Sequence, residues 1–386
     1  MLRLSKKIQS LPPYLFAEID KAKRKARARG RDIIDLGVGD PDTPTPKYII
    51  EALCQAAKNP AHHRYALDQG MPALRQAIQG WYKRRFNVNL NPDTEILPLI
   101  GSKEGLAHFP LALLNTGDYS LVPNPCYPPY LGGTILAGGH PFSLPLLEEN
   151  CFLPDLKIIP ASIRKKAKLV YVNYPNNPTS ATAEIDFYQQ VVAFAIKNKM
   201  LVLSDLAYSE IAFDGYRPSS ALQVEGAKEV VVEFHSLSKT FNMTGWRIGW
   251  ACGHKEAIAA LGKVKSHMDS GIFSAVQVAG IAALEGPDRH TKNMCRLYQQ
   301  RRDTLLRHLN ALGLQVDYPK ATFYVWLKIP RKLSSIRFAR LLLDEADIVV
   351  TPGVGFGAYG EGFIRLALTV SQERIEEAVR RLKKVL

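Results

Sequence analysis

Residues 229–250 read EVVVEFHSLSKTFNMTGWRIGW. The apolar run at 229–236 predicts a buried strand, and the polar turn with Lys239 marks the carboxyl end of that strand. In open parallel sheets, ligands bind beyond the carboxyl ends of the strands. This stretch therefore predicts both a strand of a sheet and the edge at which a ligand site lies.

Similar apolar runs alternate with helical patterns from about residue 47 to residue 280. The runs lie at 95–100, 119–123, 168–174 and 200–205, and MPALRQAIQGWYKRRF at 71–86 has the periodicity of a helix. Alternation of this kind indicates an α/β fold, with a mainly parallel sheet covered by helices.

The pattern changes after residue 270. A long helical stretch is followed by strand-like runs at 321–329, 347–353 and 362–368 and by a closing basic helix. This order predicts a smaller α+β domain. We expect an arm at 1–40 that packs on the small domain, a large cofactor-binding domain at 41–284 and a small C-terminal domain at 285–386.

Length and composition are those of a folded globular protein. The 386 residues suit two domains, and 46% hydrophobic with 22% charged residues exclude a disordered chain. The net charge of +14 is densest at 21–31, but no nucleic-acid motif accompanies it, so we expect no nucleic-acid partner. With no bilayer-length apolar run and no signal-like start, we expect no membrane association and a cytoplasmic location. The five scattered cysteines predict reduced, mostly buried thiols and no metal site.

Two short motifs are better explained by structural roles than by ligand binding or catalysis. GFGAYG at 355–360 fits the GxGxxG string of dinucleotide-binding folds, but a strand-like run follows it where a helix is required. We expect a glycine-rich turn there. His62 and His63 have no partner at metal-ligand spacing, so ordinary polar roles are expected for both.

Polar side chains gather where the predicted strands end. Asn177 follows the run at 168–174, Asp205 and Tyr208 follow 200–205, and Ser236, Ser238, Lys239 and Arg247 follow 229–236. At Ser102 a glycine turn starts a helix, whose free N–H groups suit an anion. Each residue alone has an ordinary alternative, such as a cap, a turn or an ion pair. Together they favour a cofactor site.

Pyridoxal phosphate requires this set of groups. A buried carboxylate keeps its ring nitrogen protonated, and Asp205 is of that type. Donors for its phenolate oxygen are available from Tyr208 and Asn177, and Lys239 provides the amine for a Schiff base with its aldehyde. A helix N-terminus, hydroxyls and a guanidinium suit its phosphate, and these are Ser102, Ser236, Ser238 and Arg247.

The motifs PNNPTSA, SDLAYSEIAFDG and SLSKTFNMTGWRIGW resemble those of the fold type I pyridoxal-phosphate aminotransferases, and the resemblance runs nearly end to end. It implies catalytic roles for Lys239, Asp205 and Tyr208 and a ping-pong transamination between amino and keto acids through the Lys239 Schiff base. It further implies that Tyr127 stacks on the cofactor ring. The implied phosphate site contains Ser102, Lys103, Ser236, Ser238 and Arg247. Tyr65 would reach this site from the partner subunit.

The same resemblance implies a substrate site and an assembly. Arg365 would bind the substrate α-carboxylate, assisted by Asn177 and the backbone at Gly39. The position of Tyr65 implies a homodimer with shared active sites. Ser180 departs from the pattern, because the family usually has glycine after Pro-Thr; a small residue there should be tolerated, with a slight shift of the Asn177 loop.

Within the family, the runs LPPYLFAEIDK, IGSKEGLAHFPLALLN, GGTILAGGHPF and VKSHMDSGIFSAVQ resemble the branch that forms LL-diaminopimelate. This implies transfer of the amino group of glutamate to tetrahydrodipicolinate, in lysine and cell-wall precursor synthesis. Relatives that act on aspartate, alanine or aromatic amino acids share the cofactor residues, and a carbon–sulfur β-lyase would use the same lysine, so these alternatives stay open. By position only, Tyr14 and nearby basic residues are candidates for recognising a distal carboxylate.

Overall fold

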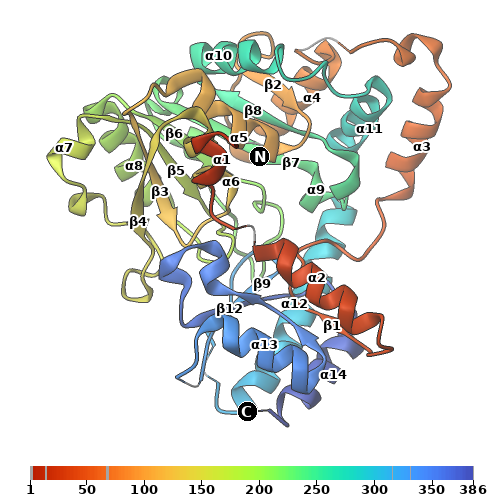
Figure 1. Cartoon of the computed structure of the whole chain (residues 1–386). Helices are drawn as coiled ribbons and strands as arrows, with labels where there is room; N and C mark the ends of the chain where they lie inside the picture. Colours follow the sequence, from red (N-terminus) through yellow and green to blue (C-terminus); the bar gives the residue numbers. More distant parts are fainter. Residues whose placement is uncertain (1–2, 14, 67–68, 315, 331, 386) are drawn as a thin grey trace.

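The structure is a computed structural model that describes residues 3–13, 15–66, 69–314, 316–330 and 332–385. Tyr14 lies outside the described residues. Figure 1 shows a larger part built around a twisted sheet and a smaller part that contains the C-terminal strands and helices.

The larger sheet has seven strands in the order β2-β8-β7-β6-β5-β3-β4. In chain order the strands are β2 (Ile96–Leu99), β3 (Tyr119–Asn124), β4 (His140–Pro145), β5 (Ala167–Asn173), β6 (Leu201–Asp205), β7 (Val231–Ser236) and β8 (Gly249–Gly253). All pairings are parallel except those of β8, which runs antiparallel to β7 and β2. The predicted mainly parallel sheet is confirmed.

Helices accompany the strands along the chain. They are α3 (Lys47–Ala57), α4 (Pro72–Phe86), α5 (Ser102–Leu113), α6 (Pro129–Ala137), α7 (Ala161–Arg164), α8 (Ile185–Asn198), α9 (Leu237–Thr240), α10 (Lys255–Lys265) and α11 (Ser274–Glu285). The predicted helix at 71–86 is α4. Pro72 stands at its first position, and Asn87, in the left-handed conformation, ends it.

Both faces of the larger sheet are buried. In β5, Val170 and Val172 belong to one apolar cluster, whereas Leu169 and Tyr171 belong to another. Because alternate side chains point to opposite faces, the strand must be apolar throughout. This explains why the strands appear in the sequence as continuous apolar runs.

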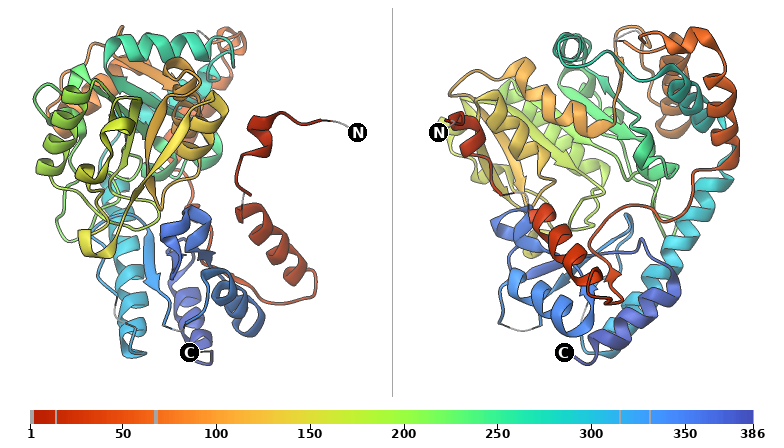
Figure 2. Two further views of the ribbon diagram at one scale, coloured as in Figure 1. Left: turned by 60° about the vertical axis from the view of Figure 1, so that its left-hand side comes forward. Right: turned by 45° about the vertical axis from the view of Figure 1, so that its right-hand side comes forward.

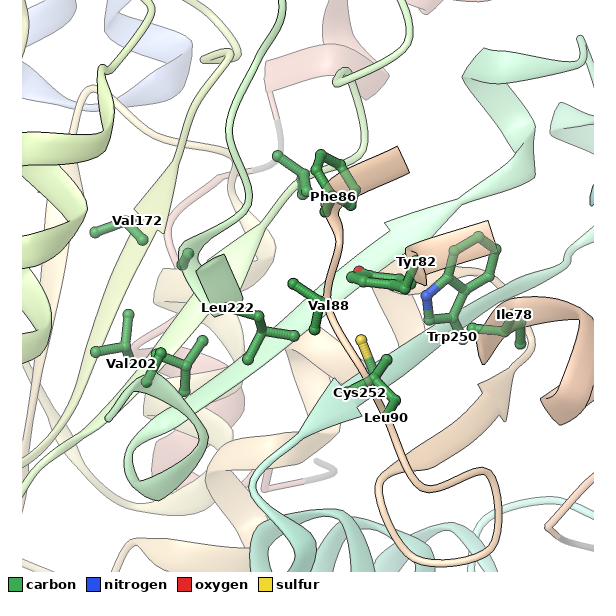
Figure 3. Close-up of a cluster of buried hydrophobic side chains, with 14 of the residues drawn as sticks. Ile78, Tyr82, Phe86, Val88, Leu90, Val172, Val202, Leu222, Trp250 and Cys252 are labelled. Carbon is green, nitrogen blue, oxygen red and sulfur yellow. The ribbon is translucent and has the colours of Figure 1, made fainter. Parts of the chain in front are cut away.

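The first of these clusters packs α4 against the sheet. Figure 3 shows Ile78 and Tyr82 of α4 beside Trp250 and Cys252 of β8. The rings of Tyr82 and Trp250 meet edge to face, with centroids 6.3 Å apart. This contact anchors β8, which is the strand after the Lys239 turn.

The smaller part has two short sheets. β9 (Tyr324–Lys328), β11 (Thr351–Pro352) and β12 (Phe363–Ala367) form an antiparallel sheet in the order β11-β12-β9. β1 (Ile34–Asp35) pairs in parallel with β10 (Ile348–Val349). The helices here are α12 (Arg289–Ala311), α13 (Ser335–Ala346) and α14 (Gln372–Leu382), and α12 extends from the larger part into the smaller (Figure 1).

The N-terminal residues contact both parts. Lys7 Nζ of α1 (Lys6–Gln9) donates to Leu136 O of α6 at 2.9 Å. α2 (Leu15–Arg27) lies along the smaller part (Figure 2), where Ala26 packs with Ile33 and Val349. The arm at 1–40 and the boundary near residue 284 stay predictions.

Smaller expectations have mixed outcomes. The GFGAYG segment forms turns between β11 and β12, as predicted. The rings of His62 and His63 hydrogen-bond the carbonyls of Ala56 and Ala57. The cysteines are free thiols, but the expectation that they are mostly buried is wrong: of the five, Cys126 and Cys252 are buried, Cys295 is half-buried, and Cys54 and Cys151 are exposed. No helix within the described ranges has the length and apolarity to cross a bilayer.

Candidate active site

The carboxyl ends of β5, β6 and β7 border a cavity of about 210 Å³. Every predicted site residue except Tyr65 lines it: Gly39, Ser102, Lys103, Tyr127, Asn177, Asp205, Tyr208, Ser236, Ser238, Lys239, Arg247 and Arg365. Tyr65 lies outside the cavity lining and is 90% exposed. The structure thus brings the predicted residues together, while their individual roles remain predictions.

Asp205 ends β6 and is 4% exposed. Its Oδ2 accepts a hydrogen bond from the hydroxyl of Tyr130 at 2.7 Å, and its Oδ1 accepts one from Ala207 N at 3.3 Å. Burial raises the pKa of this carboxyl to about 6, although both hydrogen bonds oppose the rise. Within the described residues no cationic side chain pairs with Asp205.

Lys239 belongs to α9, the single turn that follows β7. Its Nζ donates to Gly39 O at 2.8 Å and lies 5.6 Å from the centre of the Phe323 ring. Burial lowers the pKa of Lys239 to about 8; Asp40 opposes this, and Arg365 and Arg247 add to it. With a pKa of about 8, about one-tenth of this amine is neutral at pH 7, far more than for an ordinary lysine, and the neutral amine is the form that nucleophilic attack and proton abstraction require.

Glycines bring an anion-binding set of groups together. α5 begins at Ser102 directly after Gly101, whose φ of 77° is unfavourable for any residue with a Cβ. A Cβ at Gly101 would also overlap the Arg247 guanidinium, and one at Gly249 would lie 2.8 Å from Ser102 N. These glycines therefore allow the N-terminus of α5, Arg247 and the β7–β8 pair to approach closely.

Serines complete this region of the cavity. Ser236 Oγ accepts from Ser238 N at 3.2 Å, which caps the turn carrying Lys239. Arg247 Nη1 donates to Thr244 O at 2.8 Å, and Thr244 also lines the cavity. Hydroxyls, a guanidinium and a helix N-terminus suit a dianionic phosphate.

Arg365 enters the cavity from β12 and is 3% exposed. It donates to Asn177 Oδ1 and to Gly37 O, both at 2.7 Å. Because the amide oxygen of Asn177 accepts from Arg365, its Nδ2 group faces away from the guanidinium and can donate elsewhere. The pair therefore offers a carboxylate-binding guanidinium beside an amide donor.

Four cavity residues were not predicted: Asn173, Ala207, Thr244 and Tyr324. Asn173 could have been found, because it ends the strand predicted at 168–174, and its Nδ2 donates to Asp205 O at 2.8 Å. No comparable feature of the sequence indicated that Tyr324 belongs to the site. It lies inside a predicted strand of the smaller part, and the hydroxyl it meets belongs to Tyr208, 116 positions earlier.

The residue at the unusual position after Pro-Thr, Ser180, is accommodated in a left-handed conformation with φ 61°. Its hydroxyl hydrogen-bonds Thr322 Oγ1 at 2.9 Å and Tyr324 O at 2.8 Å. Ser180 thus links the turn that carries Asn177 to the segment that leads into β9.

Comparison with known proteins agrees with this geometry. The family model described as aminotransferase class I and II matches residues 31–382. The chain therefore belongs to the aminotransferase class I and II family, with the α/β architecture of fold type I, and it is an aminotransferase.

Similar relatives are LL-diaminopimelate aminotransferases. The one from Syntrophobacter fumaroxidans is 55% identical over 381 residues, which cover 99% of this chain and 98% of the relative. The one from Aquifex aeolicus is 52% identical over 383 residues and 99% of both chains. Among solved structures, substrate-bound BacF from Bacillus subtilis has a TM-score of 0.97 and 41% identity, covering 100% of this chain and 98% of that one. A Thermus thermophilus aspartate aminotransferase double mutant has a TM-score of 0.93 and 31% identity, covering 100% of both chains.

Proposed function

We propose that this chain binds pyridoxal phosphate and transfers the amino group of glutamate to tetrahydrodipicolinate, forming LL-diaminopimelate and 2-oxoglutarate. The observation that carries the proposal is a single cavity in which Asp205, Lys239, Arg247 and Arg365 meet. The substrate assignment draws on the relatives that carry the name LL-diaminopimelate aminotransferase.

The side chains present fit the cofactor that this family uses. Asp205 is a buried carboxylate without a cationic partner among the described residues, so a protonated ring nitrogen would supply the missing positive charge. Ser102, Lys103, Ser236, Ser238 and Arg247 would hold the phosphate, and Tyr127 would lie against the ring. Tyr208 and Asn177 would donate to the phenolate oxygen, and Lys239 would hold the aldehyde carbon covalently.

When bound, pyridoxal phosphate supplies an electron-withdrawing ring that stabilises negative charge at the substrate Cα. Lys239 Nζ provides the amine that moves a proton to and from that carbon, and its lowered pKa suits both directions. Arg365 binds the α-carboxylate with two parallel hydrogen bonds and so orients the Cα–H bond.

The assembly and location belong to the same proposal. The strongly exposed Tyr65 would reach the phosphate site of the partner subunit in a homodimer with shared active sites. The enzyme would act in the cytoplasm on amino and keto acids.

The test is a half-reaction followed by absorbance. The purified chain is reconstituted with pyridoxal phosphate and mixed in turn with LL-diaminopimelate, alanine and aspartate. We expect LL-diaminopimelate to convert the cofactor to its amine form and 2-oxoglutarate to restore it. Equal or better conversion by alanine or aspartate would contradict the substrate assignment. Pyruvate and ammonia from cystathionine would indicate a carbon–sulfur β-lyase.

A further inference from the structure

Tyr324 is the residue at which several groups of the cavity meet. It begins β9 and is 2% exposed. Its hydroxyl lies 3.0 Å from the hydroxyl of Tyr208, and the guanidinium of Arg365 lies 4.1 Å from the centre of its ring. A Cβ at position 39 would overlap the Tyr324 hydroxyl, so that glycine backbone lies directly on it.

The backbone around Tyr324 is held in place. Its amide donates to Thr322 Oγ1 at 3.0 Å, and its carbonyl accepts from Ser180 Oγ at 2.8 Å. Strand pairing places it opposite Ala367 of β12, two residues after Arg365. Because both the ring and the backbone are buried and bonded, the hydroxyl has a fixed position relative to Tyr208.

The hydrogen bond between the two phenols has a direction that the proposed function determines. A phenol has one proton to donate. If Tyr208 donates that proton to a cofactor oxygen, its own oxygen must accept from Tyr324. Tyr324 then acts as the outer donor of a two-phenol chain and keeps the Tyr208 proton aimed into the cavity.

The ring of Tyr324 has a separate role. The Arg365 guanidinium lies over this ring and 4.8 Å from the centre of the Phe356 ring. Cation–π contact with desolvated aromatic faces stabilises a buried guanidinium and fixes its plane. A fixed plane is what bidentate recognition of a carboxylate requires.

We propose that Tyr324 is a positioning residue with two separable functions: its hydroxyl orients the proton of Tyr208, and its ring holds Arg365 for the substrate carboxylate. This inference deepens the proposed function and rests on it. Tyr324 thereby connects the site of carboxylate binding to the site of cofactor binding through a single side chain.

Two substitutions separate the functions. Tyr324→Phe removes only the hydroxyl, whereas Tyr324→Leu also removes the ring. Tyr298→Phe is the matched control, because the Tyr298 hydroxyl is buried without a hydrogen-bond partner among the described residues and its ring also contacts Phe323. Far-UV circular dichroism and thermal unfolding of each cofactor-free variant establish that it is folded.

The first measurement is a pH titration of the absorbance of bound pyridoxal phosphate, together with its dissociation constant. We expect Tyr324→Phe to raise the pH at the midpoint of this titration by about half a unit. Without the Tyr324 hydroxyl, Tyr208 donates a weaker hydrogen bond to the phenolate oxygen of the cofactor, so the cofactor form that predominates at high pH is stabilised less. Tyr208→Phe should shift it in the same direction and further. In the double variant, Tyr324→Phe should add nothing, because its effect passes through Tyr208.

The second measurement is the KM for the amino acid. Tyr324→Phe should leave it within about twofold of the original, and Tyr324→Leu should raise it about tenfold through loss of the cation–π contact. The inference is overturned if Tyr324→Phe titrates like Tyr298→Phe, if its effect adds to that of Tyr208→Phe, or if Tyr324→Leu leaves KM unchanged. A chain that binds no pyridoxal phosphate at all would overturn the proposed function as well, so the two failures are distinguishable.

Discussion

The cavity has a first wall formed at the seven-stranded sheet and a second wall formed at the three-stranded sheet of β9, β11 and β12. The two walls position their functional side chains differently. On the larger sheet, Asp205 is the last residue of its strand and Lys239 lies in the turn directly after another. On the smaller sheet, Tyr324 and Arg365 lie within paired strands. Arg365 meets Asn177 across 188 positions of sequence.

The comparison shows two ways to position a functional side chain. At a strand end, local structure suffices, because all parallel strands deliver their carboxyl ends to one edge. Within a strand of a second sheet, position depends on how that sheet packs on the first. Substitutions on the first wall should therefore affect chemistry and cofactor binding. On the second wall, substitution of Arg365 should mainly affect substrate binding, whereas Tyr324 contacts groups of both sites.

The largest effect is expected at Lys239. Lys239→Ala should lower kcat by about 10⁴-fold or more, because the amine that moves the Cα proton is lost. Steady-state assays of a preparation free of other aminotransferases measure this, with the exposed Lys197→Ala on α8 as control. Near-normal turnover of Lys239→Ala would contradict the role of the first wall.

A smaller effect, confined to substrate binding, is expected on the second wall. Arg365→Ala removes the guanidinium that we propose binds the substrate α-carboxylate through two charge-assisted hydrogen bonds. Each such bond contributes about 1.5–3 kcal/mol, so KM for the amino acid should rise about 100-fold or more. Retention of pyridoxal phosphate should change little. If cofactor affinity fell as much as substrate affinity, Arg365 would not act mainly through substrate binding. The exposed Arg340→Ala on α13 is a suitable control.

Asp205 links the first wall to pH-dependent stability. Its carboxyl pKa is raised from 3.8 to about 6 by burial, so the folded chain binds this proton more tightly than the unfolded chain. Stability without cofactor should therefore fall as pH rises from about 4 to about 7, by up to about 3 kcal/mol from this group.

Asp205→Asn should remove that dependence. Urea unfolding of the cofactor-free variant should show a higher free energy of unfolding than the original chain at about pH 8 and a similar one at about pH 4. The same variant should bind pyridoxal phosphate more weakly. Parallel pH profiles for the two chains would mean that the pKa of Asp205 is the same in the folded and the unfolded chain.

The smallest effect is expected at Ser180, where the two walls are joined. Ser180→Gly relieves the cost of a positive φ, about 1 kcal/mol, but loses the hydroxyl bonds to Thr322 and Tyr324, so its net effect on unfolding should be near zero. Ser180→Ala loses the bonds without that relief and should be less stable by about 1–2 kcal/mol. Equal stabilities of the two variants would show that the backbone conformation carries no strain.

Much of the fold could be predicted because buried parallel strands leave continuous apolar runs. β5, β6 and β7 were found in this way. β4 was missed because His140–Pro145 contains two prolines, which an edge strand tolerates. β8 was missed because it has only five residues, GWACG, which begin and end with glycine.

The residues of the candidate site also differ in whether the sequence predicts them. The strand-end residues were predicted from local pattern. The family resemblance added Arg365, Gly39, Tyr127, Lys103 and Tyr65, and of these Tyr65 does not line the cavity. Neither identified Tyr324, because its importance arises from contacts with Tyr208 and Arg365 that only the packing of two sheets creates. Tertiary contacts between distant segments leave no signature in a single sequence.

The most direct test of the central claim is chemical labelling that identifies the lysine to which the cofactor is attached. The purified chain is saturated with pyridoxal phosphate, reduced with borohydride and digested, and the modified peptide is identified by mass spectrometry. We predict one pyridoxyl group per chain, on the peptide that contains Lys239, and its loss in Lys239→Ala. Labelling spread over surface lysines, or unchanged in Lys239→Ala, would contradict the assignment of this cavity as the cofactor site.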